Sequence, residues 1–183
     1  IKTATSTIDA GASAVGYIYE YPFPSTAENT VKTYTIEGGD NIEAEEMEYS
    51  FIEHFSLSGA PGEALMLSAD WVGRQVSTCT WTSTATCSLP TVSEILFNKG
   101  KLCIADETTE TPWNSQISST LLDFSLDVTT GWQPVTTADG NLYFTFLKNS
   151  GPEIALDLTF EHNATSLVEK DEWKTQRGKV IRL

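Results

Sequence analysis

The sequence predicts a mainly β fold with two short helices. Apolar and polar residues alternate along several segments with the two-residue period of half-buried strands. Turns that contain Gly and Pro separate these segments, and two stretches carry helix-capping signals. The chain has 183 residues, of which 40% are hydrophobic, so it is long enough to bury the core of one ordinary domain.

The first predicted element is a β-hairpin over residues 49–71. One face of its first strand is apolar, and the opposite face carries Ile52 and His54. Both faces of this strand are therefore partly apolar. A turn rich in Gly and Pro follows at residues 58–62, and the returning strand places Asp70 opposite its apolar face. The main apolar face of the first strand comprises Tyr49, Phe51, Phe55 and Leu57.

Six further strands are expected, and the two clearest each oppose an apolar face to an acidic one. In one of them Asp123 and Asp127 alternate with leucine, phenylalanine and valine. In the other Asp157 and Glu161 lie opposite an apolar row. The six ranges are 75–81, 102–104, 117–129, 142–147, 154–162 and 180 onward.

Capping signals predict the two helices. Thr91 and Glu94 have the spacing of a capping box, which predicts a short helix that ends near Asn98. A second helix is expected over residues 164–176, with Asn163 as its N-cap. Its apolar side would consist of Leu167, Val168 and Trp173.

The charge distribution is strongly acidic, with a formal net charge of −14. Residues 33–73 contain nine carboxylates and no Lys or Arg, and residues 102–147 contain six more, again without a base. Phosphate binding depends on Lys and Arg, so this composition argues against a protein that coats nucleic acid. Carboxylates along strands indicate either a solvated surface or a surface that repels a negatively charged molecule.

Five of the eleven basic residues fall within residues 170–182. Two interpretations of this run remain open. It is a solvated helix face, or it pairs with an acidic surface on a neighbouring copy of the chain.

Three cysteines cannot all pair within one chain. Cys79 and Cys87 flank residues 80–86, which look like a hairpin across which the two side chains would face each other. The odd count and the missing signal-peptide pattern favour free thiols instead. Cys103 lies in a short apolar strand and is expected to be a small core residue.

No catalytic or metal-binding constellation stands out. His54 and His162 each lie alone, and no Cys/His cluster has zinc spacing, so we expect no metal and no cofactor. Asp123 and Asp127 would lie about 13 Å apart along one strand, too far for a catalytic carboxylate pair unless another strand contributes. No apolar run approaches the roughly 18 residues that span a membrane. We therefore expect a protein that is neither an enzyme nor bound to a membrane.

Several motifs occur together in one order along residues 33–183. They are YTIEGGD at 34–40, FSLSG at 55–59 with PGE at 61–63, SADWVGRQ at 68–75, EIL at 94–96 before KLCIAD at 101–106, LDVTTGW at 126–132 with Pro134, LTFEHN at 158–163, Trp173, and IRL at 181–183. No single motif is decisive, but as a set they resemble the major tail tube proteins of long-tailed, siphophage-type bacteriophages. Residues 1–32, which match no motif, are expected to form an N-terminal arm outside this single domain.

The resemblance implies a β-sandwich or half-barrel with a flanking helix, assembled as hexameric rings that stack into a hollow tube. A sheet from each subunit would join its neighbours into one inner barrel, an architecture similar to that of type-six secretion tubes. Genomic DNA would pass through the tube without specific binding. The implied partners are other copies of the chain and the tail tip, tape measure and tail terminator proteins. The implied location is the virion tail, with assembly in the host cytoplasm.

The resemblance also implies where the charged residues lie in the tube. The lumen-lining candidates are Asp70, Asp123, Asp127, Asp157 and Glu161. The acidic segment 43–48 would be a loop or arm that reaches the next ring and meets the basic run near the C-terminus. The inter-subunit candidates are Glu43, Glu45, Glu46 and Glu48 on the acidic side and Lys170, Lys174 and Arg177 on the basic side.

Two other classes of protein remain open. A secreted carbohydrate-binding β-sandwich would also be acidic and rich in Trp, and would use Trp81, Trp113 or Trp132 as a sugar platform. Buried core aromatics are the simpler interpretation of these residues. A hydrolase is the third class, but the sequence shows no nucleophile, metal set or carboxylate pair at usable spacing.

Overall fold

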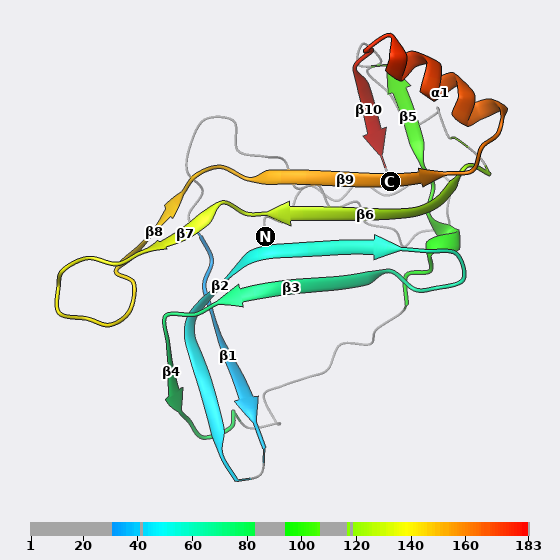
Figure 1. Ribbon diagram of the computed structural model, residues 1–183. Helices are drawn as coiled ribbons and strands as arrows, with labels where there is room; N and C mark the ends of the chain where they lie inside the picture. The colour runs from blue at the N-terminus through cyan, green and yellow to red at the C-terminus, as the bar shows by residue number, and fades with distance from the viewer. Residues whose placement is uncertain (1–30, 41, 83–93, 107–116, 118, 183) are drawn as a thin grey trace, which may run out of the picture. The chain divides into compact units, whose positions relative to one another are not determined.

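The computed structural model describes residues 31–40, 42–82, 94–106, 117 and 119–182 (Figure 1). This part of the chain is mainly β, with antiparallel strand pairs and one short α-helix, so the predicted fold class is confirmed. The strands are β1 (Tyr34–Gly39), β2 (Ala44–Gly59), β3 (Met66–Val72), β4 (Gln75–Thr78), β5 (Cys103–Asp106), β6 (Leu121–Thr129), β7 (Trp132–Val135), β8 (Phe146–Asn149), β9 (Glu153–Phe160) and β10 (Lys179–Arg182). The helices are the 3₁₀ turn η1 (Phe97–Lys99) and α1 (Ala164–Lys174).

The chain divides into two compact units, and the boundary runs through β2. One unit consists of Ile1–Phe51 and Gly73–Cys79, and the other of Ile52–Val72 and Thr80–Leu183. The predicted arm over residues 1–32 lies, apart from its last two residues, outside the described residues. The predicted single domain over residues 33–183 stays a prediction.

The first unit contains a three-stranded antiparallel sheet in the order β1–β2–β4. Within it, Glu46 of β2 lies opposite Glu37 of β1 on one side and Ser77 of β4 on the other. The acidic segment 43–48, expected as a loop or arm, is a paired strand from Ala44 onward rather than a loop, and its contact with a next ring stays a prediction. Backbone pairing on both sides outweighs the low strand propensity of glutamate.

A β-bulge interrupts β2 at Tyr49. Tyr49 has a φ of 54°, and the register against β1 shifts between Tyr34 and Ile36. Because a bulge inserts one residue into one strand, side chains beyond it change face. Ser50 and Phe51 are both buried, at 0% and 1% exposure, whereas Tyr49 is 44% exposed. Tyr49 and Phe51 therefore do not share a face, contrary to the alternation that the sequence predicts.

The second unit is built on a four-stranded antiparallel sheet in the order β3–β2–β6–β9 (Figure 1). The register places Leu57 opposite Leu126, and Leu126 opposite Leu156, so the apolar rows of three strands share one face. Phe124 and Val128 of β6 are buried. The predicted hairpin over residues 49–71 and the predicted alternation of β6 and β9 are confirmed.

Leu122 is the exception on β6, with 38% exposure. The pairing of β6 with β9 shifts register between Leu121 and Asp123, which displaces this side chain from the apolar row. The strand also begins at Leu121 rather than at residue 117.

The helix predicted from Thr91 to Asn98 is wrong where it can be examined. Glu94, Ile95 and Leu96 are not helical, and a single 3₁₀ turn follows at Phe97–Lys99. Backbone bonds to the end of the β2–β3 turn explain the difference, because Leu65 N–H donates to the Ile95 carbonyl at 2.8 Å and Phe97 N–H donates to Glu63 at 3.1 Å. The capping residue Thr91 lies outside the described residues.

Phe97 instead stacks on Phe124, with ring centroids 6.1 Å apart. Gly59 lies against both rings, and a Cβ at this position would overlap Phe124, Phe97 and Leu65. A glycine at the end of β2 thus permits the close packing of η1 on the sheet.

The predicted second helix is confirmed as α1, and Asn163 caps it as expected. The Asn163 side-chain oxygen accepts from the N–H groups of Thr165 and Ser166, each at 3.0 Å, and the Ser166 hydroxyl accepts from Asn163 N–H at 2.9 Å. The Asn163 amide also donates to the Ser119 carbonyl at 3.0 Å, which ties the helix to the start of β6. The predicted apolar side of the helix is exposed: Leu167 44%, Val168 55% and Trp173 76%.

Beside α1, β5 and β10 form a two-stranded antiparallel sheet. Residues Leu102 to Ala105 are all buried, and Cys103 at 5% exposure is the core residue that the sequence predicts. Cys87 lies outside the described residues, and so does the predicted hairpin between Cys79 and Cys87 beyond Thr82.

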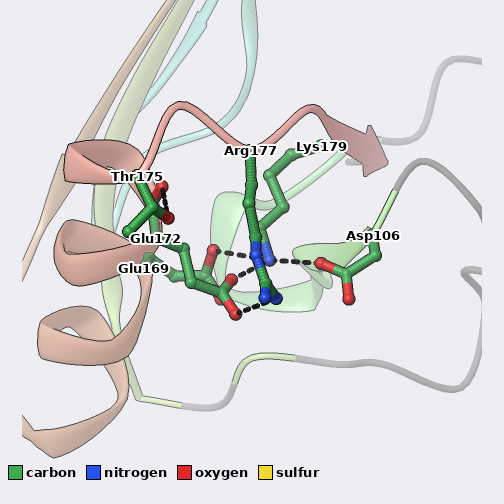
Figure 2. Close-up of polar contacts among 6 residues, drawn as sticks. All are labelled: Asp106, Glu169, Glu172, Thr175, Arg177 and Lys179. Atoms are coloured by element: carbon green, nitrogen blue, oxygen red, sulfur yellow. Dashed lines mark hydrogen bonds and ion pairs between the residues drawn. The ribbon is translucent and has the colours of Figure 1, made fainter.

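One lysine joins α1 to the β5–β10 pair (Figure 2). Lys179 Nζ lies 2.9 Å from Asp106 Oδ1 on β5 and 3.7 Å from Glu169 Oε2 on α1, and it also pairs with Glu172. The bond to Glu172 first, and then the bond to Asp106, raises the pKa of Lys179 above its usual range. The same contact with Lys179 lowers the pKa of Asp106.

We predict that Lys179→Met destabilises the second unit by about 1–2 kcal/mol, because it leaves partly buried carboxylates without their cation. The stabilisation should be complete between the ordinary pKa of aspartate and that of lysine. It should be lost as the pH falls through the lowered pKa of Asp106, and again as the pH rises through the raised pKa of Lys179. Urea denaturation as a function of pH measures both effects.

The matched control is Lys174→Met, which removes the same charge from an exposed pair with Asp171. Exposed pairs contribute little, so this variant should unfold almost like the parent protein. Equal destabilisation by the two substitutions would refute the role assigned to Lys179.

Candidate functional site

The polar side of the β3–β2–β6–β9 sheet gathers most of the candidate lumen residues on one surface. Side chains that lie opposite each other in paired strands share a face. Ser56 of β2 lies opposite Asp127 of β6, and Ser125 of β6 lies opposite Asp157 of β9. We call this surface the acidic face. Its ionisable residues are Asp70, Asp123, Asp127, Glu153 and Asp157, together with His54.

The register brings carboxylates from different strands closer than the sequence alone indicates. Asp157 is the diagonal neighbour of both Asp123 and Asp127, because these lie opposite Thr159 and Ala155. Diagonal neighbours are about 7–8 Å apart, so β9 places a third carboxylate between two that lie along β6. Carboxylates at this spacing repel one another.

Catalysis by such a pair requires that burial hold one carboxyl group protonated. Asp70 and Asp127, the two members next to His54, are instead solvated, with side chains 74% and 42% exposed. These two side chains thus form part of a solvated, charged surface.

His54 lies between two of these carboxylates. Its Nδ1 atom is 3.3 Å from Asp70 Oδ2 on β3, and its Nε2 atom is 3.6 Å from Asp127 Oδ1 on β6. The imidazole thus spans three adjacent strands across the acidic face. The expectation that His54 lies alone is therefore wrong. The predicted turn at residues 58–62 does not place position 70 opposite position 54. The two meet because β2 ends at Gly59 and β3 begins only at Met66, which makes the turn longer than predicted.

Glu161 lies just beyond the end of β9, so its place among the lumen candidates stays a prediction. β9 ends at Phe160, and the Glu161 N–H donates to the Thr120 carbonyl at 2.8 Å as the chain turns toward α1. Strand alternation therefore no longer fixes the direction of this side chain. Glu153, at the other end of β9, was missed because the predicted strand began one residue later.

Among the residues that the structure describes, no group of three or more His, Cys, Asp and Glu side chains could hold a metal ion. His54, Asp70 and Asp127 extend in a line across the sheet, with one carboxylate at each ring nitrogen, rather than converge on one point. The acidic face is thus a row of separate charges.

The acidic inter-subunit candidates lie in the first unit. Glu48 accepts from Gln75 Nε2 at 3.0 Å, and Glu46 accepts from the Ser77 hydroxyl at 3.4 Å. Desolvation, with the charges of Glu37, Glu46 and Glu45, raises the pKa of the Cys79 thiol in the same sheet. Glu43 precedes β2, and its N–H donates to Asp40 Oδ1 at 3.0 Å.

The basic candidates lie on and after α1 in the second unit. Lys174 pairs with Asp171 at 2.8 Å, and Arg177 pairs with Glu172 at 3.6 Å. Both cations thus have partners within their own chain, which favours the interpretation of this run as a solvated helix face. Lys170 is exposed on the same helix.

The aromatic candidates for sugar binding do not form one platform in the described residues. Trp81 is 47% exposed, Trp132 at the start of β7 is half-buried, and Trp113 lies outside the described residues. Within the described part of the chain, no helix is long and apolar enough to cross a membrane.

The chain matches no known protein family in a comparison with family models, and no curated protein matches it.

We predict that Asp157→Asn stabilises the second unit by about 0.3 kcal/mol at low ionic strength, because it removes the carboxylate nearest to two others. The gain should disappear near 1 M salt, where the screening length falls to about 3 Å. Urea denaturation at two salt concentrations measures the difference. Asp171→Asn, which removes a carboxylate with a cationic partner, should not stabilise at either concentration. A gain for Asp157→Asn that does not depend on salt would contradict the repulsion.

Proposed function

We propose that this protein is the structural subunit of a hollow tube, in which hexameric rings stack to form the tail tube of a long-tailed bacteriophage. The acidic face would line the channel through which phage DNA reaches the host. The observation that carries the proposal is one sheet with an apolar face, an acidic face and two edge strands, β3 and β9, in the described fold.

The strand directions allow the sheet to continue from copy to copy. Neighbouring strands alternate in direction along β3–β2–β6–β9, so the two edge strands run in opposite directions. Copies related by rotation about the tube axis would therefore bring β9 of one antiparallel to β3 of the next. Closure into a barrel satisfies the backbone groups that an edge strand otherwise leaves open to aggregation.

The size of such a barrel suits the proposed cargo. Six copies of a four-stranded sheet supply 24 strands. At about 4.8 Å per strand, the circumference is about 115 Å and the diameter about 37 Å. Strand tilt widens the barrel further. The channel that remains inside the side chains admits a DNA duplex.

The charge of the acidic face gives the channel a surface that DNA does not adhere to. Among the described residues of this face, five carboxylates accompany a single histidine and no Lys or Arg. DNA binding depends on cations that displace counterions from phosphate, so the wall repels the duplex instead of holding it. Passage without specific binding is the behaviour that DNA delivery requires.

Exposed apolar side chains also support assembly. Met66 and Leu67 on the edge strand β3 are 64% and 69% exposed, and the apolar side of α1 is exposed as well. Apolar surface of this kind marks contacts between proteins. In the proposed virion tail these contacts would be with other copies of the chain. The tail tip, tape measure and tail terminator proteins would be bound at the ends and inside the tube.

The polar composition of the second face of the β2 hairpin strand supports its place at the channel. Of that face, Ile52 is apolar and half-buried, whereas His54, Ser56 and Ser58 are polar. This face is therefore polar for most of its length. A polar face belongs at the channel, and the contacts with neighbours would come from the strand edges.

We predict that the purified protein at high concentration forms six-fold rings or hollow filaments in negative-stain electron microscopy. Ala155→Pro and Leu156→Pro, made separately on β9, test the edge contact. Alternate residues of an edge strand point their N–H groups outward. One of the two prolines should therefore keep the parent melting temperature and abolish rings, whereas the other should destabilise the fold. Rings from the stable proline variant would contradict the proposed edge contact.

We also predict that reversing the charge of the acidic face makes the tube retain DNA. Tubes of the Asp123→Lys, Asp157→Lys variant should bind duplex DNA in a filter or sedimentation assay, with affinity that falls steeply as salt rises. The matched control is Glu53→Lys, Asp171→Lys, which makes the same charge change away from the acidic face and should bind no DNA. Equal binding by both variants would remove the acidic face from the channel.

The carbohydrate-binding alternative keeps one supporting observation, the exposed indole of Trp81. Titration with oligosaccharides would change the Trp fluorescence of a sugar-binding module. A tube subunit should show no change.

A further inference from the structure

The loop between β7 and β8, residues 136–145, is held in a defined conformation by Asp139. Its Oδ1 atom accepts from Asn141 N–H at 3.1 Å, and its Oδ2 atom accepts from the Thr145 hydroxyl at 2.9 Å. These bonds lower the pKa of Asp139 to about 2. The Thr137 and Thr145 hydroxyls, 2.7 Å apart, close the base of the loop. We call residues 136–145 the β7–β8 loop.

This ordered loop presents an apolar side chain to solvent. Leu142 is fully exposed, at 102%, and Phe146 at the start of β8 is 50% exposed. A flexible loop would let such a side chain fold back, but the Asp139 bonds hold the loop open. A preorganised loop loses little entropy when it binds, so the exposed leucine has the character of an anchor for a pocket on another molecule.

The second unit also contains a matching apolar groove. It has a volume of about 620 Å³ and is lined by residues from β2, β6, the segment 95–102 and neighbouring turns. Lys99 and Lys101 are also among its lining residues. A groove of this size accommodates several apolar groups. The apolar residues that define it here are Leu57, Leu65, Ile95, Leu96, Leu102 and Leu121.

The groove and the β7–β8 loop lie beyond opposite ends of β6. The groove lies where β6 begins, at Leu121 and Phe124, beside the end of β2 at Leu57. β6 ends at Thr129, and β7 follows at Trp132 and leads away to the loop (Figure 1). At about 3.4 Å per residue, the five steps from Phe124 at the groove to Thr129 at the end of β6 span about 17 Å, and β7 leads the chain further from the groove. The loop of one chain therefore cannot fill the groove of the same chain.

We propose that the β7–β8 loop of one copy inserts Leu142 into the apolar groove of a second copy. The contact joins different surfaces of the two copies, so it repeats head to tail without closing, which is the geometry that produces filaments. The ionised Asp139 on the loop complements Lys99 and Lys101 of the groove. This inference rests on the proposed tube function. It deepens that function by assigning the contact that stacks one ring on the next.

Leu142→Asp tests the anchor. With rings joined through β3 and β9, this variant should still form rings but should raise the protein concentration needed for tubes by about tenfold or more, as a lost apolar anchor of this size implies. Thr136→Asp is the matched control, because it adds the same charge at the base of the same loop and leaves Leu142 in place. It should form tubes like the parent protein. Tubes from Leu142→Asp at the parent concentration would overturn the inference.

Cross-linking tests the partner of the anchor directly. Leu142→Cys and Leu96→Cys would be made separately, each in a background with Cys79, Cys87 and Cys103 replaced by Ser. Oxidation should produce a disulfide-linked dimer in a mixture of the two proteins and none in either protein alone. Absence of the dimer from the mixture would overturn the inference.

The two proposals can fail separately. Tubes without the mixed cross-link would leave the tube function standing and remove the stacking contact. If the parent protein forms neither rings nor tubes, the tube function fails. The mixed cross-link at high concentration would then still establish the head-to-tail contact, and its absence would refute that contact too.

Discussion

The two-residue alternation of β6 is the constraint on which the sheet and the proposed channel depend. Phe124 and Val128 are buried on one side, while Asp123 and Asp127 face the other. A slip of one residue would exchange the two sets and bury the aspartates among apolar side chains. The strands on both sides confirm the same register, because Leu57 and Leu156 meet Leu126, and Ser56 meets Asp127. The alternation therefore fixes where the apolar and the acidic residues of the sheet lie.

That constraint has a consequence beyond one chain. A sheet with one charged face and two edge strands leaves backbone groups open at β3 and β9 in the described fold, and apolar residues such as Met66 and Leu67 exposed nearby. Pairing the edges with other copies covers both and repeats the acidic face around a closed surface. In this account, the acidity that makes the chain a poor ligand for DNA makes the assembly a suitable conduit for it. The β7–β8 loop and the apolar groove then supply contacts along a second direction.

Local patterns in the sequence were enough to predict β6 and β9, but not β1, β7 or the first part of β2. Long-range contacts explain several of the differences. The alternation of β6 and β9 and the Asn163 cap of α1 depend on residues close in sequence, and these predictions are confirmed. The helix predicted after Thr91 gave way to a backbone bridge between Leu96 and Ala64, a contact that no local signal contains. The bulge at Tyr49, the bridging position of His54 and the pair between Lys179 and Asp106 likewise depend on residues brought together from distant segments. At the candidate site, four of the five predicted lumen residues lie on one surface. The distances between them could not be predicted from the sequence, because they depend on the register between β6 and β9.

Cryo-electron microscopy of the assembled protein, at a resolution that separates the strands of a sheet, tests the central claim most directly. The account predicts a closed ring in which β9 of each copy pairs antiparallel with β3 of the next, with Asp157 and Asp123 facing an open channel. A particle in which β3 and β9 make no contact between copies, or in which these aspartates face outward, would contradict it.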